Sequence, residues 1–194
     1  MMKLEMNGAV ITNHYQQILR DLHEVRWYIF TAILIFVAGN VLAILIPALG
    51  ENILRGVLEY LKTFKNKNAL ELVIAIFLKN ASSALFAILF SFFFGLPPAF
   101  AAAFNGITMG AVLNLNPLNF FKLLPHGIFE LPAMFIAWGL GLWCAVAFFP
   151  LPSLEVITFR IKRSLNIYLS IIVPLLIIAA IVEVLGIKIL YGIK

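Results

Sequence analysis

Long apolar runs alternate with short polar stretches along the chain, and this alternation predicts membrane-spanning helices. The first run opens with Trp27 and Tyr28 and ends at Ile46, directly before Pro47. About 20 apolar residues are enough to cross a bilayer as a helix, with aromatic side chains at the headgroup level. Similar runs follow it. The predicted spans are about 27–46, 78–95, 99–113, 126–149 and 166–187.

The stretch at about 51–68 has a different pattern. Its apolar residues recur at spacings of three and four, and charged residues occupy the opposite side of the helix that this spacing implies. The apolar side holds Ile53, Leu54, Val57, Leu58, Leu61 and Phe64, and the polar side holds Arg55, Glu59, Lys62 and Lys65. This segment is predicted to be an amphipathic helix that lies at the membrane interface or on the bundle.

The composition indicates the same class of protein. The 194 residues are 63% hydrophobic and 12% charged, and the mean hydropathy is +1.03. Soluble domains carry about 25% charged residues, and a soluble fold of this size has too little interior for so many apolar side chains. The predicted fold is therefore all-α, an integral membrane bundle of about five spans over 27–194, preceded by a polar N-terminal segment over 1–26.

The formal net charge of +5 is typical of loop lysines and arginines that meet lipid headgroups. The lipid bilayer is thus an expected partner, whereas nucleic acid is not, because no soluble basic face with aromatic residues is visible. The positive-inside rule is close to a tie, and Arg20 and Arg26 beside the first span favour a multi-pass cell-membrane protein with its N-terminus inside. Cys144 is the single cysteine, which excludes an internal disulfide.

Small residues line one face of three predicted spans. Helices in lipid gain nothing from hydrophobic exclusion between one another, so they pack where small side chains let their backbones approach. These faces are Asn80, Ser83, Ala87, Ser91 and Gly95 in the second span, Ala102, Gly106 and Gly110 in the third, and His126, Glu130, Ala133, Ala137, Gly141 and Ala145 in the fourth. They predict tight helix contacts and, because one bundle need not use all of them, a homo-oligomer.

Polar side chains lie on these small-residue faces. His126 and Glu130 are four residues apart, so they share one side of a helix and can touch. A charged side chain in hydrocarbon costs about 2.5 kcal/mol or more. The pair is therefore predicted to face protein and to form a polar cluster with Asn80 and Asn105. Two interpretations remain open, a structural clasp near the headgroups and a functional polar site.

Two further residues are predicted to contribute to this cluster. Pro132 cannot donate a hydrogen bond to the carbonyl of Ile128, so it is expected to kink the fourth span or to divide it into half-helices. Glu183 lies late in the fifth span, either at the membrane surface or directed into the bundle. No cofactor or catalytic metal is expected, because a zinc protease needs two histidines on one helix face and His126 with Glu130 makes a poor site alone.

Several motifs fall between residues 77 and 150. Lys79–Asn80 precedes a small-residue span, FNGITMGAV follows at 104–112, and HGIFELPA at 126–133 precedes a run that contains Gly139 and Gly141. Together they resemble the core of the stage II sporulation protein M family. The resemblance implies a polytopic membrane protein of about five spans, with signature residues that have no known chemical role at Asn80, Asn105, His126 and Glu130.

The same resemblance suggests what the protein does. In spore-forming bacteria, members of this family help to hold a peptidoglycan-degrading complex at the septal membrane during engulfment, and relatives occur in organisms that do not sporulate. The prediction is a membrane scaffold or assembly factor with envelope-associated partners. The alternative is a small-solute or ion transporter or channel with the Asn/His/Glu cluster as its path. An enzyme is not expected, because no nucleophile–base pair and no paired carboxylates share one face.

Overall fold

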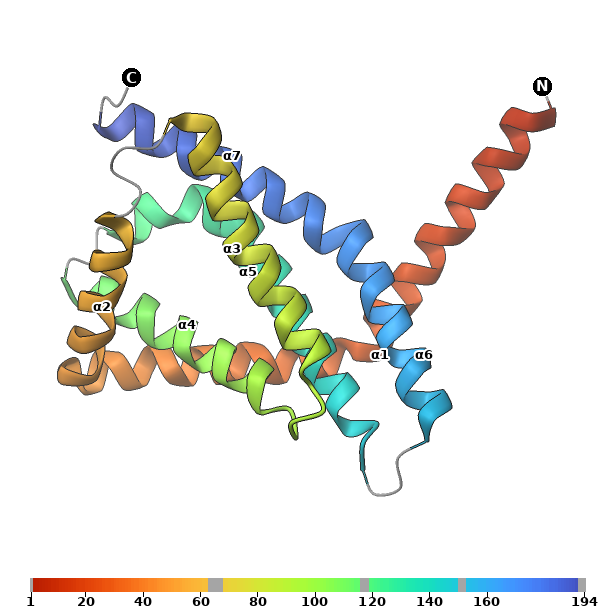
Figure 1. Ribbon diagram of the computed structural model, residues 1–194, viewed down its shortest axis with the longest axis horizontal. Coiled ribbons are helices and arrows are strands. Elements are labelled where there is room, and N and C mark those ends of the chain that lie inside the picture. Colours follow the sequence, from red (N-terminus) through yellow and green to blue (C-terminus); the bar gives the residue numbers. More distant parts are fainter. Residues whose placement is uncertain (1, 63–67, 116–118, 150–152, 192–194) are drawn as a thin grey trace.

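The computed structural model describes residues 2–62, 68–115, 119–149 and 153–191, and every regular element within these ranges is a helix (Figure 1). Side chains at 2–14, 119–124, 126, 187–191 and several positions of 52–62 lie outside that description. The elements are α1 (Met2–Leu45), α2 (Pro47–Lys62), α3 (Ala69–Leu89), α4 (Leu96–Leu115), α5 (Asn119–Val146), α6 (Leu154–Ile167), the π-helical turn η1 (Tyr168–Ile172) and α7 (Val173–Tyr191).

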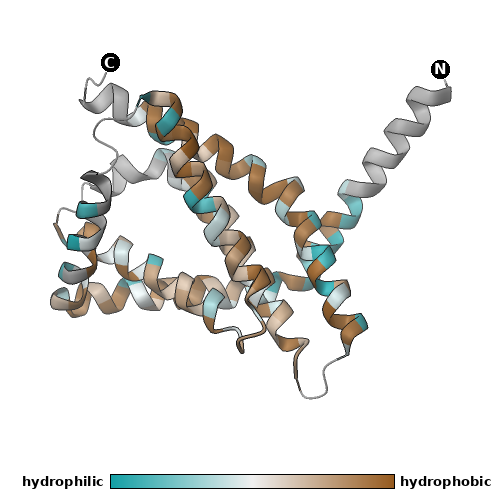
Figure 2. Cartoon of the chain, viewed as in Figure 1, coloured by the Kyte–Doolittle hydropathy of each residue, from teal (hydrophilic) through white to brown (hydrophobic). Residues whose placement is uncertain are grey.

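Five helical segments of the described chain are long and apolar enough to cross a membrane. They are Tyr15–Leu45, Ala69–Leu89, Leu96–Leu115, Gly127–Val146 and Leu154–Gly186, the last of which passes through α6, η1 and α7. The remaining helix, α2, has 16 residues and carries hydrophilic positions among its apolar ones (Figure 2). The prediction of an all-α membrane bundle with about five spans is confirmed.

The second span lies earlier in the chain than the predicted 78–95. The Asn68 side chain accepts a hydrogen bond from the Glu71 backbone N–H at 2.9 Å, and the Glu71 carboxylate accepts one from the Asn68 N–H at 3.0 Å. This capping box satisfies free N–H groups at the helix start, so α3 begins at Ala69. It ends at Leu89, and the turn into α4 uses positive φ angles of 57° at Phe94 and 72° at Gly95.

Two other helices differ in detail from the sequence pattern. α1 passes the predicted boundary between residues 26 and 27 without a break, because this part of the sequence contains neither proline nor a turn signal. α5 contains both Pro125 and Pro132 and is still one helix. Figure 1 shows that α5 changes direction along its length, so the predicted interruption of the fourth span takes the form of a bend.

α1 and α4 lie side by side with their backbones in contact (Figure 1). A methyl group added at Gly39 of α1 would lie 2.5 Å from the carbonyl oxygen of Ala103 in α4. Gly106 of α4 approaches the carbonyl of Phe36 in α1 at least as closely. Only glycine fits at such positions, and the close approach maximises van der Waals contact between helices in lipid.

α5 occupies the centre of the bundle and packs against α1, α3, α4, α6 and α7. Its residues Ala133, Ala137, Trp138 and Leu140 are buried, with Trp138 among the largest fully buried side chains. A methyl group at Gly141 would lie 2.5 Å from the carbonyl oxygen of Ala87 in α3. The small-residue faces of the second and fourth spans are therefore in close contact, as expected for helices that pack through small side chains.

Candidate functional site

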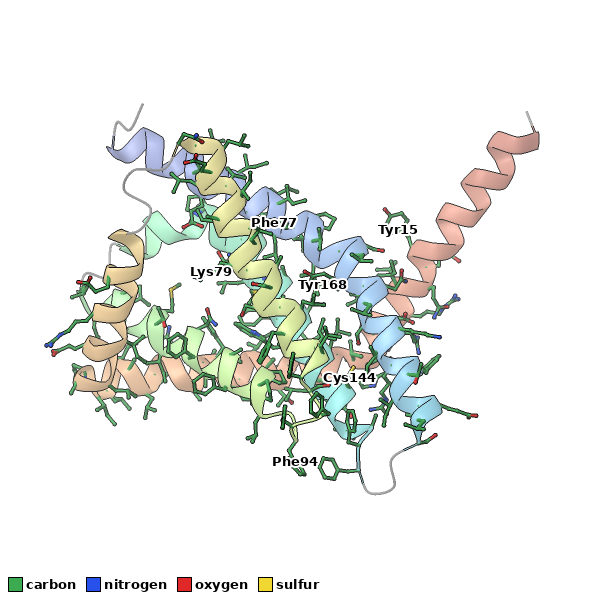
Figure 3. All side chains as sticks on the ribbon, in the orientation of Figure 1. Tyr15, Phe77, Lys79, Phe94, Cys144 and Tyr168 are labelled. Atoms are coloured by element: carbon green, nitrogen blue, oxygen red, sulfur yellow. The ribbon has the colours of Figure 1, made fainter. Side chains whose placement is uncertain are left out.

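The predicted polar cluster begins on α3 with Asn80. Asn80 is buried and lies on the same helix face as the fully buried Ala84 and Ala87. The next residue, Ala81, accepts a hydrogen bond at its carbonyl from the hydroxyl of Tyr168, at 3.0 Å and in a buried setting (Figure 3). The small-residue face of α3 thus carries polar groups into the protein interior, as its spacing predicted.

Asn105 of α4 makes a hydrogen bond within its own helix. Its Nδ2 donates a hydrogen bond at 2.8 Å to the carbonyl of Ala101, one turn earlier in the same helix. The side chain is half-buried, and the neighbouring Gly106 packs against α1. Asn105 therefore uses an amide N–H within its own helix, and this bond does not join α4 to the other members of the cluster.

The fourth and fifth spans supply the acidic members. Glu130 of α5 and Glu183 of α7 are both half-buried, whereas Pro132 is exposed. Lys79 of α3 and Glu183 of α7 lie near each other across the α3–α7 contact. The side chain of His126 lies outside the described residues, so the contact between His126 and Glu130 stays a prediction.

A second polar cluster, which the sequence pattern did not reveal, joins α1 to α6. Asp21 of α1 is only 2% exposed and pairs with the guanidinium of Arg163. Arg163 also pairs with Glu24 at 2.9 Å, and Gln17 donates to Asp21 at 2.7 Å. We call Asp21, Glu24, Arg160 and Arg163 the α1–α6 charge cluster. Its buried carboxylate needs the arginine, because an unpaired buried charge costs several kcal/mol.

Arg160 extends the same cluster to α5. Its Nη1 donates at 2.5 Å to the carbonyl of Trp143, and its guanidinium lies 4.9 Å from the centre of the Trp143 ring. The carbonyl of Trp143 is in the last turn of α5, where no backbone N–H of the helix remains to pair with it. Arg160 therefore caps α5 and stacks on it, and it ties the middle of α6 to the end of α5.

Only an indirect signal of this cluster is present in the amino-acid sequence. The basic residues of α6 were assigned to lipid headgroups, and Asp21 and Glu24 to a polar segment before the bundle. Arg163 and Asp21 are 142 positions apart in the chain, and their pairing depends on how α6 crosses α1. Acidic residues close to an apolar run are nevertheless a reason to look for a distant basic partner.

Family comparison bears on both clusters. The model of the family described as stage II sporulation protein M matches residues 29–185. The chain belongs to the stage II sporulation protein M family. No curated protein matches the chain, and no solved structure matches it either. The matched residues include every member of the predicted cluster. They also include Arg160 and Arg163, but not Asp21 and Glu24, which are the partners of Arg163.

This family member also has a cleft at the corner where α1, α2 and α4 meet. Its volume is about 280 Å³, and it is lined by Pro47, Gly50, Glu51, Ala111, Asn114 and Leu115. The Nδ2 of Asn114 donates at 2.8 Å to the carbonyl of Ala43. In a regular helix this carbonyl would accept from residue 47, but Pro47 has no N–H. Asn114 thus supplies from α4 the donor that α1 lacks.

Within the described residues, no group of three His, Cys, Asp or Glu side chains gathers closely enough to hold a metal ion. The predicted cluster offers amide and carboxylate groups in separate helices. In the α1–α6 charge cluster, Arg163 pairs with Asp21 and Glu24, and Arg160 donates to the carbonyl of Trp143. Neither arrangement presents an activated nucleophile with a base beside it. The α1–α6 charge cluster provides polar contact between helices inside an apolar bundle.

Proposed function

We propose that this member of the stage II sporulation protein M family is an integral membrane scaffold or assembly factor. Its expected place is the cell membrane, with the N-terminus inside and with envelope-associated proteins as partners. The family resemblance supports this role, because it implies that members in spore-forming bacteria help to hold a peptidoglycan-degrading complex at a membrane. We infer no catalytic role for the chain.

The packing of the small-residue faces is the observation that carries this proposal. Ala84, Ala87, Ala133 and Ala137 are each 0% exposed, and Gly141 leaves no room for a methyl group beside α3. A solute path along this seam would need space that neighbouring backbones fill. Close backbone contact suits a rigid platform, on which partners meet a fixed surface.

In this proposal, the Asn80, Asn105, His126 and Glu130 cluster acts as a polar clasp within the scaffold. A polar group in the bilayer interior is costly unless it is paired, so matched polar groups specify how the spans associate. Burial of Asn80 and the half-buried position of Glu130 are consistent with a role inside the bundle. Glu183 would contribute in the same way, through the nearby charge of Lys79.

A small-solute or ion transporter is the second candidate, and the ionisable residues within the spans favour it. Lys79, Glu130 and Glu183 lie in segments long and apolar enough to cross the membrane. Ionisable groups at such depth often mark ion or proton pathways. The bend of α5 and the π-helical turn before Pro174 are the kinds of irregularity that transporters place near their sites.

Substitution of Glu130 separates the two candidates. We expect Glu130→Gln to lower the melting temperature of the detergent-solubilised protein, or to dissociate its complexes, because it weakens contact between spans. Proteoliposomes containing the wild-type protein should show no flux of protons, K⁺ or Na⁺ above protein-free liposomes. Glu155→Gln is the matched control, since Glu155 is an exposed glutamate in the first turn of α6.

The opposite pattern would favour transport. In that case the wild-type protein would conduct in liposomes, and Glu130→Gln would abolish the flux without a change in melting temperature. Glu183→Gln, assayed in parallel, tests whether the Lys79–Glu183 neighbourhood belongs to the same path. A scaffold predicts a stability effect there, and a transporter predicts a loss of flux.

A further inference from the structure

The cleft between α1, α2 and α4 lies where the first and third spans end. Pro47 follows the last residue of α1 by two positions, and Ala111, Asn114 and Leu115 belong to the final turns of α4. The amphipathic α2 runs across these span ends (Figure 1). Because apolar spans end at the headgroup region, the mouth of the cleft is at the depth of lipid headgroups.

The polar side chains that line the cleft, Glu51 and Asn114, can both accept hydrogen bonds. Glu51 contributes an exposed carboxylate, and no described residue makes a hydrogen bond or ion pair with it. Asn114 uses its Nδ2 on the carbonyl of Ala43, and its Oδ1 can accept a hydrogen bond. A ligand that suits both groups must carry a positive charge and N–H donors.

The remaining walls are apolar and firmly held. Pro47, Ala111 and Leu115 line the cleft, and a methyl group at Gly50 would lie 2.7 Å from the Cβ of Ala111. The outward surface of α1 beside the cleft is apolar as well, with exposed side chains at Val41, Leu42 and Leu45. A ligand with a cationic head and acyl chains can place the head in the cleft and its chains along α1.

We propose that this cleft binds the headgroup of a phospholipid that carries a primary ammonium group. The ammonium donates to the carboxylate of Glu51 and to the Oδ1 of Asn114. Arg55, exposed and one helical turn after Glu51 on α2, is placed to meet the lipid phosphate. Glu51 thus meets the positive ammonium of the headgroup, and Arg55 meets its negative phosphate. This site is independent of the scaffold role proposed above.

Lipid competition tests the site with the full-length protein. In mixed micelles with equal amounts of phosphatidylethanolamine, phosphatidylcholine and phosphatidylglycerol of identical chains, native mass spectrometry counts the lipids retained. We expect phosphatidylethanolamine to be retained roughly tenfold over phosphatidylcholine, whose quaternary ammonium has no N–H to donate. Stepwise N-methylation of the headgroup should reduce retention at each step.

Two variants and one soluble competitor make the outcome decisive. Glu51→Gln should bring phosphatidylethanolamine retention close to that of phosphatidylcholine. Glu59→Gln, an exposed position two turns further along α2 and outside the cleft lining, should leave the preference unchanged. Equal retention of the three lipids, or an unchanged preference in Glu51→Gln, overturns the proposal. Displacement of the lipid by millimolar glycerophosphoethanolamine would show instead a site for soluble amines, and would equally overturn it.

Discussion

At the residue scale, prolines interrupt the regular hydrogen bonding of a helix, and the chain compensates for this at Pro47 and at Pro174. Pro47 leaves the carbonyl of Ala43 without its helical donor, and Asn114 replaces that donor from α4. Pro174 is preceded by the π-helical turn η1, in which the N–H of Val173 bonds to the carbonyl of Tyr168. The wider turn moves the backbone away from the position that the proline ring would strike. Both solutions keep buried backbone groups paired.

The Asn114–Ala43 bond gives a prediction that can be tested by a double-mutant cycle. Asn114→Leu removes the donor and should cost about 1–3 kcal/mol of unfolding free energy, because the carbonyl of the buried Ala43 is left unpaired. Pro47→Ala supplies a backbone N–H to the same carbonyl. In that background, Asn114→Leu should cost clearly less, as measured by chemical or thermal unfolding in detergent. Equal costs in the two backgrounds would show that Asn114 does not replace the missing donor.

At the scale of helices, backbone-to-backbone contact determines which spans associate. α1 and α4 approach through glycine on both sides, at Gly39 and at Gly106, so each helix provides a recess for the carbonyls of the other. α3 and α5 meet in the same way at Gly141. Large side chains such as Trp138 then fill the centre. In lipid, contact between apolar helices gives no gain from the hydrophobic effect. The van der Waals contacts of this packing must therefore supply the free energy of helix association.

Alanine at Gly106 tests the α1–α4 contact. Its Cβ would collide with the Phe36 carbonyl, so Gly106→Ala should destabilise the protein by about 1–3 kcal/mol through displacement of α1. Gly56→Ala is the matched control, because a Cβ at Gly56 of α2 meets nothing within 4 Å. It should be neutral or stabilising, by up to about 1 kcal/mol, since alanine favours helix. Thermal unfolding of both variants in the same detergent compares them, and equal melting temperatures would contradict the packing argument.

At the scale of the whole molecule, a first span that crosses the membrane has its two ends on opposite sides. The α1–α6 charge cluster ties α6 to the start of this span through Asp21, and α2 follows its other end. Lys162 on α6 and Arg55 on α2 are both exposed. The two positions are therefore expected on opposite faces, and the flanking arginines of the first span favour the Lys162 side as the inner one.

Cysteine labelling in intact cells tests this arrangement. In a Cys144→Ala background, Arg55→Cys should react with a membrane-impermeant maleimide, whereas Lys162→Cys should react only after permeabilisation. Cys144 itself is buried and makes a suitable residue to remove. The reverse labelling pattern would mean that the N-terminus is outside. Labelling of both positions in intact cells would contradict a bundle in which an odd number of spans separates them.

The sequence by itself determined the membrane class, the helical content and the small-residue faces of the spans. These features depend on hydropathy and on a repeat of three to four residues, both of which are local properties. The sequence pattern located the starts and ends of helices less well. It placed the start of the second span near Lys79 and Asn80, whereas the capping box at Asn68 and Glu71 starts α3 at Ala69. The burial of Asn80 also followed from the pattern, since its neighbours on that face are small.

Only the tertiary structure decided which groups meet. Arg163 pairs with Asp21 across 142 positions and Asn114 with Ala43 across 71, and no local pattern connects such residues. Asn105 makes a bond that the face pattern does not indicate, because its amide donates to a carbonyl one turn earlier in its own helix. The physical reason is the same throughout: periodicity fixes the face on which a side chain lies, while its partner depends on which helix the folded chain brings to that face.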